Sequence, residues 1–272
     1  MTLHIRPNLS PGYSSIVGPG NPHIKLIEFG VLRLDGSMRE ELDTKGRECL
    51  GVVLTGRCTV EGEGFAWKSI GGRSNVFAAP PTSFYLGPGT HCGINADGPV
   101  DVALAFSPSD LKLKAVLIPP EQTKARVVGV HNWTRTVTDI LPPSSPARYL
   151  LVGETIQAPG NWSSYPPHCH EKDNPPLETK LEEVYYFKLL PSRGFGMQRL
   201  YSDDGSLDEA HTVVDNDVVL IPRGYHPVAA APGYQLYYLW MLAGDKRVMI
   251  PRDDPGHAWV KDAEAIVKAA RQ

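Results

Sequence analysis

The amino-acid sequence predicts a mostly β protein in which short strands are joined by many turns. Its 272 residues include 26 glycines and 25 prolines, above the share of about 12 % that these two residues usually have together. They separate short apolar stretches instead of forming one block, which is typical of an antiparallel barrel or sandwich. The length suits one large or two small domains. A chain of this size can bury a full core without disulfide bonds.

The predicted strands are short runs of β-branched, aromatic and aliphatic residues bounded by Gly, Pro or Asp. In chain order they cover residues 24–34, 49–55, 84–86, 102–106, 148–156, 183–190, 195–201, 217–221 and 234–242. The segment 135–141 is predicted to hold a helical turn, which the two prolines at 142 and 143 would end. A C-terminal helix packed on the β body is expected over 257–272, because apolar residues recur there at helical spacing. These residues are Trp259, Ala263, Ile266, Val267 and Ala270.

Charge and composition exclude several classes of protein. Lys and Arg number 27 against 30 Asp and Glu, a formal net charge of −3, and no basic run marks a nucleic-acid binding surface. No stretch approaches about 18 consecutive apolar residues, so no membrane span is expected. The first seven residues lack the features of a signal peptide, and we therefore expect a cytoplasmic protein. The four cysteines have no paired spacing and are expected to be reduced core residues: Cys49, Cys58, Cys92 and Cys169.

A weak internal repeat divides the chain into two similar units. Glu48 opens a predicted strand, and a Gly-x-His turn that ends at His91 follows it. Late in the chain, Glu183 opens a strand and a similar turn ends at His226. A proline-rich link over residues 110–146 separates the two units. We therefore expect an N-terminal domain over residues 1–125 and a C-terminal domain over residues 126–272.

A set of histidine and glutamate residues in the second unit predicts a metal site. His168 and His170 are two residues apart, so in a strand their imidazoles point to the same face. A carboxylate at the start of the next strand, Glu182 or Glu183, and His226 in the later turn supply further ligands. Imidazole and carboxylate together suit Zn, Fe, Mn or Ni.

The order of these residues resembles that of a known superfamily. His-x-His, then Glu at a strand start, then Pro-x-Gly-x-His is similar to the two metal-binding motifs of the cupins. The chain departs from them in an insertion between the histidine pair and the glutamate, and in having one residue instead of two between the last Gly and His. Longer strings resemble the 5-deoxy-glucuronate isomerase family, which is related to 4-deoxy-5-ketouronate isomerase. These strings cover residues 161–170, 181–187, 194–201, 217–234 and 253–259.

The resemblance implies a bicupin: two tandem antiparallel β-barrel, or jelly-roll, domains with a short C-terminal helix. It implies that Glu183, directly before Val184-Tyr185, is the carboxylate ligand in place of Glu182. Zn is the metal that the resemblance suggests, with Mn or Fe as alternatives. The four implied ligands are His168, His170, Glu183 and His226.

The N-terminal domain is expected to hold no metal. Glu48 and His91 stand in the first unit where Glu183 and His226 stand in the second. No His-x-His pair precedes Glu48, so a matching site would lack two ligands and bind a divalent ion weakly.

The resemblance also implies a reaction, the aldose–ketose isomerisation of 5-deoxy-D-glucuronate to 5-dehydro-2-deoxy-D-gluconate in myo-inositol catabolism. A metal polarises the substrate carbonyl, and a positioned base moves the proton. The candidates for catalysis are Glu183, Tyr165 and Lys180. An arginine is expected to pair with the substrate carboxylate, and Gln198 and Arg199 cannot both face the barrel interior. The candidates for substrate binding are Arg199, Gln198, Arg223 and Tyr238.

Two other functions stay open on the sequence alone. Three histidines and one glutamate also suit Fe(II), so a non-haem iron dioxygenase is one alternative. A bicupin that binds a uronate without converting it is the other. The expected partner is a small-molecule uronate, with neither nucleic acid nor membrane. A homo-oligomer is also compatible with the sequence, because β-barrel edges often pair.

Overall fold

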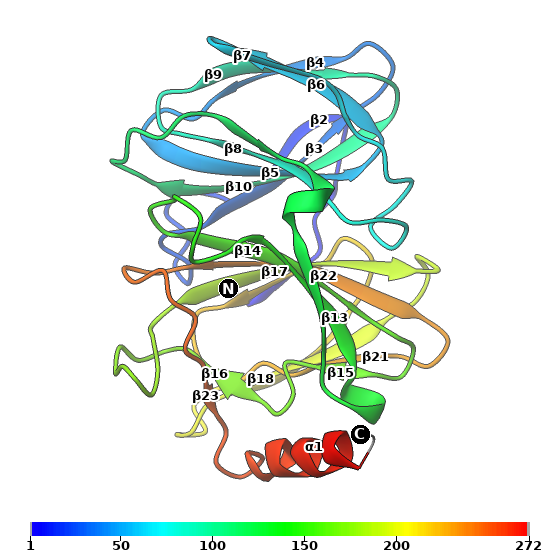
Figure 1. Ribbon diagram of the computed structural model, residues 1–272, viewed down its shortest axis with the longest axis vertical. Helices are drawn as coiled ribbons and strands as arrows, with labels where there is room; N and C mark the ends of the chain where they lie inside the picture. Colours follow the sequence, from blue (N-terminus) through cyan, green and yellow to red (C-terminus); the bar gives the residue numbers. More distant parts are fainter. Residues whose placement is uncertain (1, 271–272) are drawn as a thin grey trace.

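The computed structural model describes residues 2–270 and confirms a mostly β protein with one short α-helix. Figure 1 shows the sheets stacked as layers, with the strands of residues 12–118 in the upper layers and those of residues 124–253 in the lower layers. The helix α1 (Trp259–Ala269) lies beneath the lowest sheet. Among the described residues, no helix is both long and apolar enough to cross a membrane.

The first set of strands forms a six-stranded sheet, ordered β11-β8-β5-β10-β3-β2, and a four-stranded sheet, ordered β4-β9-β6-β7. The neighbouring strands in both sheets are antiparallel. The strands are β2 (Gly12–Val17), β3 (Glu28–Leu34), β4 (Arg39–Asp43), β5 (Arg47–Thr55), β6 (Arg57–Gly62), β7 (Phe65–Gly71), β8 (Thr82–Leu86), β9 (His91–Ala96), β10 (Val100–Pro108) and β11 (Val116–Ile118).

The second set forms a seven-stranded sheet, ordered β1-β20-β17-β22-β14-β13-β12, a four-stranded sheet, ordered β15-β21-β18-β19, and the pair β16-β23. The first strand of the chain, β1, pairs with β20 and thus lies in this second set. The strands are β1 (His4–Ile5), β12 (Lys124–Val128), β13 (Arg135–Leu141), β14 (Leu150–Gln157), β15 (Trp162–Ser163), β16 (His168–Cys169), β17 (Glu182–Leu190), β18 (Gly196–Tyr201), β19 (Asp208–Val213), β20 (Val218–Ile221), β21 (Val228–Ala230), β22 (Gln235–Ala243) and β23 (Arg252–Asp253). Short 3-10 helices cover Pro120–Gln122 and His131–Trp133.

The two large sheets pack against each other, which explains why their central strands are apolar on both faces. On β5, Leu50 and Val52 belong to a core cluster shared with strands of the seven-stranded sheet. Cys49 and Val53, which alternate with them, point into a second core between the six-stranded and four-stranded sheets. Successive side chains of a strand point to opposite faces, so burying both faces requires a continuous apolar run. The four cysteines are buried and free, as predicted.

The two sets repeat one strand order, and their registers can be compared. Strands β8-β5-β10-β3 in the first set correspond to β20-β17-β22-β14 in the second. Cys49 pairs with Leu86 in one set, and Glu183 pairs with Ile221 in the other. Cys49 therefore occupies the position that corresponds to Glu183. Our alignment of Glu48 with Glu183 was wrong by one residue, which in a strand moves the side chain to the opposite face.

One local prediction was wrong, and another was confirmed with a different buried face. The segment predicted to hold a helical turn is strand β13, which pairs with both β12 and β14, in keeping with its β-branched Thr136, Val137 and Thr138. The C-terminal helix forms as expected, but Trp259 and Ile266 are 64 % and 70 % exposed, whereas Val260 is buried. Helical spacing identifies a helix, and only the packing decides which of its faces is covered.

Candidate metal centre and active site

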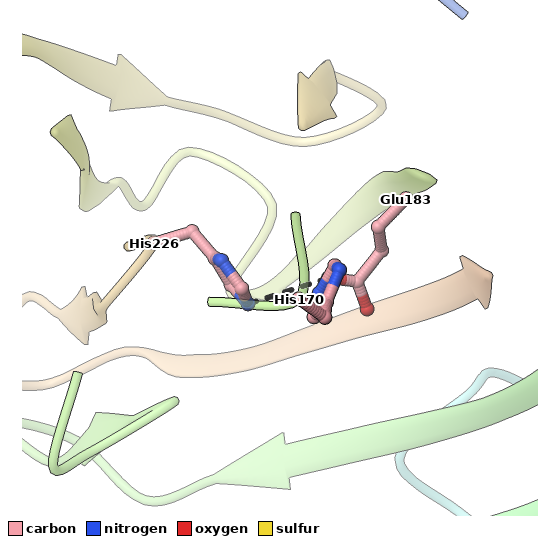
Figure 2. A group of neighbouring side chains, drawn as sticks. All are labelled: His170, Glu183 and His226. Atoms are coloured by element: carbon pink, nitrogen blue, oxygen red, sulfur yellow. Dashed lines mark hydrogen bonds and ion pairs between the residues drawn. The ribbon is translucent and has the colours of Figure 1, made fainter. Parts of the chain in front are cut away.

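Three of the predicted ligands meet in the interior of the C-terminal barrel. His170, Glu183 and His226 are buried, and each offers a ligand atom within 4.8 Å of those of the other two. Figure 2 shows the two imidazoles and the carboxylate pointing toward one another. Glu183 comes from β17, whereas His226 follows a turn at Gly224. This turn needs glycine, because its φ is +84° and a Cβ would lie 2.5 Å from the backbone oxygen of Tyr201.

The backbone holds both imidazoles with one nitrogen directed at the centre. Nδ1 of His170 donates to the backbone oxygen of Leu181 at 2.7 Å, and Nδ1 of His226 donates to that of Gly224 at 3.1 Å. A proton on Nδ1 leaves the lone pair of Nε2 available, the usual arrangement of a metal-binding histidine. The two Nε2 atoms lie 3.1 and 3.3 Å from Oε2 of Glu183.

These residues fit a divalent metal ion. Nε2 of His226 is buried and has no hydrogen-bond partner among the described residues, which is unfavourable unless another group satisfies it. Two imidazole nitrogens and a carboxylate oxygen form a donor set that Zn, Mn and Fe accept. The arrangement therefore forms a candidate metal site.

Burial affects the protonation of the histidines in two ways. It lowers the pKa of His226 and of His168 to about 3, so both rings are neutral near pH 7 and able to act as ligands. Burial also acts to lower the pKa of His170, but the hydrogen bond to Glu183, the charge of that carboxylate and the hydrogen bond to the backbone of Leu181 together outweigh it, and the pKa is raised. A nearby carboxylate favours the charged imidazole.

His168 lies next to this group, but it is not one of the three residues whose ligand atoms lie within 4.8 Å of one another. It lies on β16, which pairs with β23. Its ring centroid is 4.8 Å from that of His226 and 6.4 Å from that of His170. His168 is less buried than the other three residues, and it therefore lies at the edge of the centre.

The insertion between His170 and Glu183 folds into a closed loop, so the two ligands still meet. The backbone N–H of Leu181 donates to the backbone oxygen of His170 at 2.8 Å. Inside the loop, the buried carboxylate of Glu178 accepts the N–H groups of Glu171 and Lys172 at 2.6 and 2.9 Å. His170 and Glu183 are therefore close in space although the insertion separates them in the sequence.

The glutamate next to Glu183 has a different partner. Glu182 points away from the centre, and its carboxylate accepts the backbone N–H groups of Lys25, Leu26 and Ile27 at 2.6 to 2.9 Å, just before β3 begins. Alternation along the strand separates the two carboxylates, and the structure brings Glu183 to the site as the resemblance implied.

Glu48 also joins the two sets of sheets, but its carboxylate lies on a strand of the first set and binds backbone N–H groups of the second. Its buried carboxylate accepts the N–H groups of Arg148, Tyr149 and Leu150 at 2.6 to 3.0 Å, where β14 begins. His91, the other residue matched to the metal site, has its side chain 71 % exposed beside Asp43. Neither residue is placed to hold a metal.

Strand β18 directs Gln198 inward and Arg199 outward. Gln198 is fully buried, and within the part of the chain that the structure describes its amide nitrogen and oxygen have no hydrogen-bond partner. Arg199 is about half exposed and makes two hydrogen bonds to Asp208, at 2.8 and 2.9 Å. The expectation that Arg199 binds the substrate carboxylate does not fit this position, because its guanidinium faces solvent and is already paired.

The other predicted site residues lie at different distances from the centre. Tyr238 is buried and its ring stacks on Tyr185 at 4.3 Å. Tyr165 is partly buried and lines a hollow beside His168. Arg223 is partly exposed and contacts Asp204 and Ser206.

Lys180 does not lie at the centre. It is exposed and lines another hollow, with Lys25 and Glu182. The lining of that hollow includes none of the residues grouped at the metal centre.

Two residues at the centre were not identified as site residues from the sequence. The ring of Tyr185 lies 5.9 Å from that of His226, and its hydroxyl is 3.0 Å from Oγ of Ser164. Tyr185 is two positions from Glu183, so alternation along the strand could have placed it on the same face. Burial raises the pKa of Tyr185 well above its usual value, which keeps the phenol protonated.

Comparison with known proteins places the chain in a family. The model of the KduI/IolB family matches residues 9–260. The chain belongs to the KduI/IolB family. One member, from Geobacillus kaustophilus strain HTA426, is named 5-deoxy-glucuronate isomerase and is 43 % identical over 242 residues, which cover 89 % of this chain and 87 % of the relative. A solved structure of an IolB-like protein from Salmonella typhimurium LT2 is 34 % identical, with a TM-score of 0.93 over 96 % of this chain and 100 % of that one.

A more distant solved structure shows the wider fold. The oxalate decarboxylase of Bacillus subtilis, described with Mn(II) centres, has a TM-score of 0.62 at 12 % identity, over 90 % of this chain and 76 % of that one. This member of the KduI/IolB family therefore has the fold predicted from the cupin-like motifs, a bicupin.

Proposed function

We propose that this protein is an isomerase that converts 5-deoxy-D-glucuronate to 5-dehydro-2-deoxy-D-gluconate in myo-inositol catabolism, in the cytoplasm, with one bound divalent metal. The observation that carries the proposal is the buried convergence of His170, Glu183 and His226 in a chain whose relatives are named 5-deoxy-glucuronate isomerase over about nine tenths of their length. We propose Zn as the metal, with Mn or Fe as alternatives.

The reaction requires a proton to move between C1 and C2 of an acyclic hydroxy-aldehyde. A divalent ion held by His170, Glu183 and His226, with His168 at the edge, would polarise the carbonyl and make the neighbouring hydroxyl more acidic. His170 and His226 direct Nε2 at the centre because the Nδ1 proton of each is hydrogen-bonded to a backbone oxygen. The residues thus need little reorganisation to bind the ion.

The remaining groups at the centre would orient the substrate. Tyr185 keeps its proton because burial raises its pKa, so it can donate a hydrogen bond to a substrate oxygen while Ser164 holds its hydroxyl. Elsewhere in this half, on β18, Gln198 offers a buried amide that has no hydrogen-bond partner in residues 2–270, and we propose that it pairs with a sugar hydroxyl. Glu183 and Tyr165 remain our candidates for moving the proton.

The proposal is tested by following the reaction of 5-deoxy-glucuronate by NMR without oxygen, using protein whose metal content has been measured. The expected result is loss of the aldehyde signal and growth of a ketone signal. An unchanged aldehyde signal with fully metallated protein would reject the isomerase. Oxygen consumption would then indicate a dioxygenase, and binding without conversion would indicate a uronate-binding protein.

A further inference from the structure

A hollow of about 450 Å³ adjoins the metal centre at His168. One wall is formed by Arg135, Tyr165 and His168, and the other includes Lys261 and Lys268 of α1. His168 belongs to both places, because its ring packs against that of His226 at 4.8 Å. His168 therefore lies between the metal centre and the hollow.

Arg135, at the start of β13, is held rigidly at the wall of the hollow. Its Nη1 donates to the backbone oxygens of Trp133 and Tyr165, at 3.1 and 3.2 Å. Nε and Nη2 donate to no acceptor in residues 2–270, and none of the carboxylates there lies within 4.0 Å of the guanidinium. The side chain is partly buried, and burial lowers its pKa. A desolvated cation without an anion is unfavourable.

The other candidate arginines are already paired. Arg199 has Asp208, and Arg223 contacts Asp204. Arg252, which lies near the insertion loop, pairs with Glu178 and Asp203. Arg135 therefore differs from them in having two donors without an acceptor in residues 2–270, at a hollow that His168 also lines.

The lysines of the hollow are also neutralised. Lys261 forms an ion pair with Asp253. Lys268 pairs with Glu264 at 2.5 Å, and the other oxygen of Glu264 accepts from Nε1 of Trp133 at 3.3 Å. The positive charge of Arg135 is thus the one in this hollow that has no direct partner.

We propose that Arg135 binds the carboxylate of the substrate, through Nε and Nη2, at the end of the molecule remote from the metal centre. The inference rests on the proposed function, and it assigns the recognition of a uronate to the first residue of strand β13. A guanidinium edge binds both oxygens of a carboxylate in one plane. The substrate class is therefore an acyclic sugar acid, selected over the corresponding neutral sugar.

The test compares Arg135→Ala and Arg135→Lys with the control Arg126→Ala. Arg126 lies on the neighbouring strand β12, is half exposed and forms an ion pair with Asp139, so its removal changes the net charge equally. Each variant is assayed with 5-deoxy-glucuronate and with 5-deoxyglucose, in which an alcohol replaces the carboxylate. We expect Arg135→Ala to lower kcat/KM for the uronate by about 100-fold or more, and for the neutral sugar by less than about threefold. The kcat/KM of Arg135→Lys for the uronate should lie between those of Arg135→Ala and the wild type. That of Arg126→Ala should equal the wild-type value.

A binding measurement without turnover separates this inference from the proposed function. D-glucuronate is titrated calorimetrically into each protein, after thermal unfolding and metal content have shown that the variants are folded and loaded. Weaker binding in Arg135→Ala but not in Arg126→Ala supports the inference even if the wild type fails to isomerise anything. Equal loss for the acid and the neutral sugar, or unchanged glucuronate binding, would overturn it. If Arg135→Ala does not fold, Arg135→Lys and Arg135→Gln are compared by the same two criteria.

Discussion

At the scale of single residues, the neighbours Glu182 and Glu183 show how strand geometry separates function from stability. Both are carboxylates at the start of β17, but their side chains leave opposite faces. Glu183 meets His170 and His226, whereas Glu182 binds three backbone N–H groups before β3. One residue therefore belongs to the candidate metal site and the other to the contact between the two sets of sheets.

Replacing each of these glutamates by glutamine should give opposite results. Loss of a residue that only supports a metal ligand weakens metal binding by about 10- to 100-fold. Glu183→Gln removes a proposed ligand itself, so we expect a larger loss, with little change in the unfolding free energy of the metal-free protein. Glu182→Gln should keep the metal and lower that free energy by about 2 kcal/mol. Elemental analysis and urea unfolding in a chelator measure the two effects. The reverse pattern would show that Glu182 is the ligand.

At the scale of elements, the loop between β16 and β17 is what allows the ligands to meet. Glu178 organises the loop by accepting hydrogen bonds from two backbone N–H groups and from Nε of Arg252, the last at 3.0 Å. Burial acts to raise the pKa of Glu178, but these donors outweigh it and the pKa is lowered. The carboxylate is therefore ionised in the folded protein at a pH where it would be protonated in the unfolded chain.

The contribution of Glu178 should depend on pH in a defined direction. Because its folded pKa is below the unfolded value, its stabilisation is complete above the ordinary carboxyl range and is lost as the pH falls through the lowered value. Glu178→Gln should reduce the unfolding free energy by about 2 kcal/mol at pH 7, and the difference from the wild type should shrink at acid pH. Urea unfolding at several pH values provides the measurement. A difference that stays constant with pH would contradict this role.

At the scale of the whole molecule, two reciprocal contacts join the sets of sheets. Glu48 on β5 binds the N–H groups that precede and begin β14, and Glu182 on β17 does the same before β3. A buried ion pair between Arg73 and Glu154, at 3.0 Å, also crosses this interface. The two large sheets share one apolar core there, so the two halves are expected to unfold together.

Removal of the Glu48 contact should destabilise the whole protein. Glu48→Ala leaves backbone N–H groups in a buried place without an acceptor, and we expect a loss of roughly 3–5 kcal/mol in unfolding free energy. Glu63→Ala, at an exposed position of the same half, serves as the control and should change it by less than about 0.5 kcal/mol. Denaturant unfolding followed by tryptophan fluorescence tests both. A loss no larger than that of the control would show that the contact contributes little.

The metal content per chain should be one. In the first set of sheets, the positions that face the inner core are apolar or thiol groups, among them Cys49, Cys92 and Ile94, and Cys49 stands where Glu183 stands in the second set. Elemental analysis of the purified protein should therefore give about one divalent ion per chain, and His170→Ala combined with His226→Ala should remove it. A ratio near two would require a second site in the first set.

The sequence by itself determined the β class, the terminal helix and the order of the histidine and glutamate ligands, because turn residues, helical spacing and the His-x-His pair are local features. Only the tertiary structure decided which member of each alternating pair faces inward. Gln198 rather than Arg199 enters the barrel, and Cys49 rather than Glu48 enters the first core. Alternation states which residues share a face, but packing against other sheets selects the buried face. The tertiary structure also brought Arg135 and His168, from separate strands, to the lining of one hollow, an arrangement that no local pattern encodes.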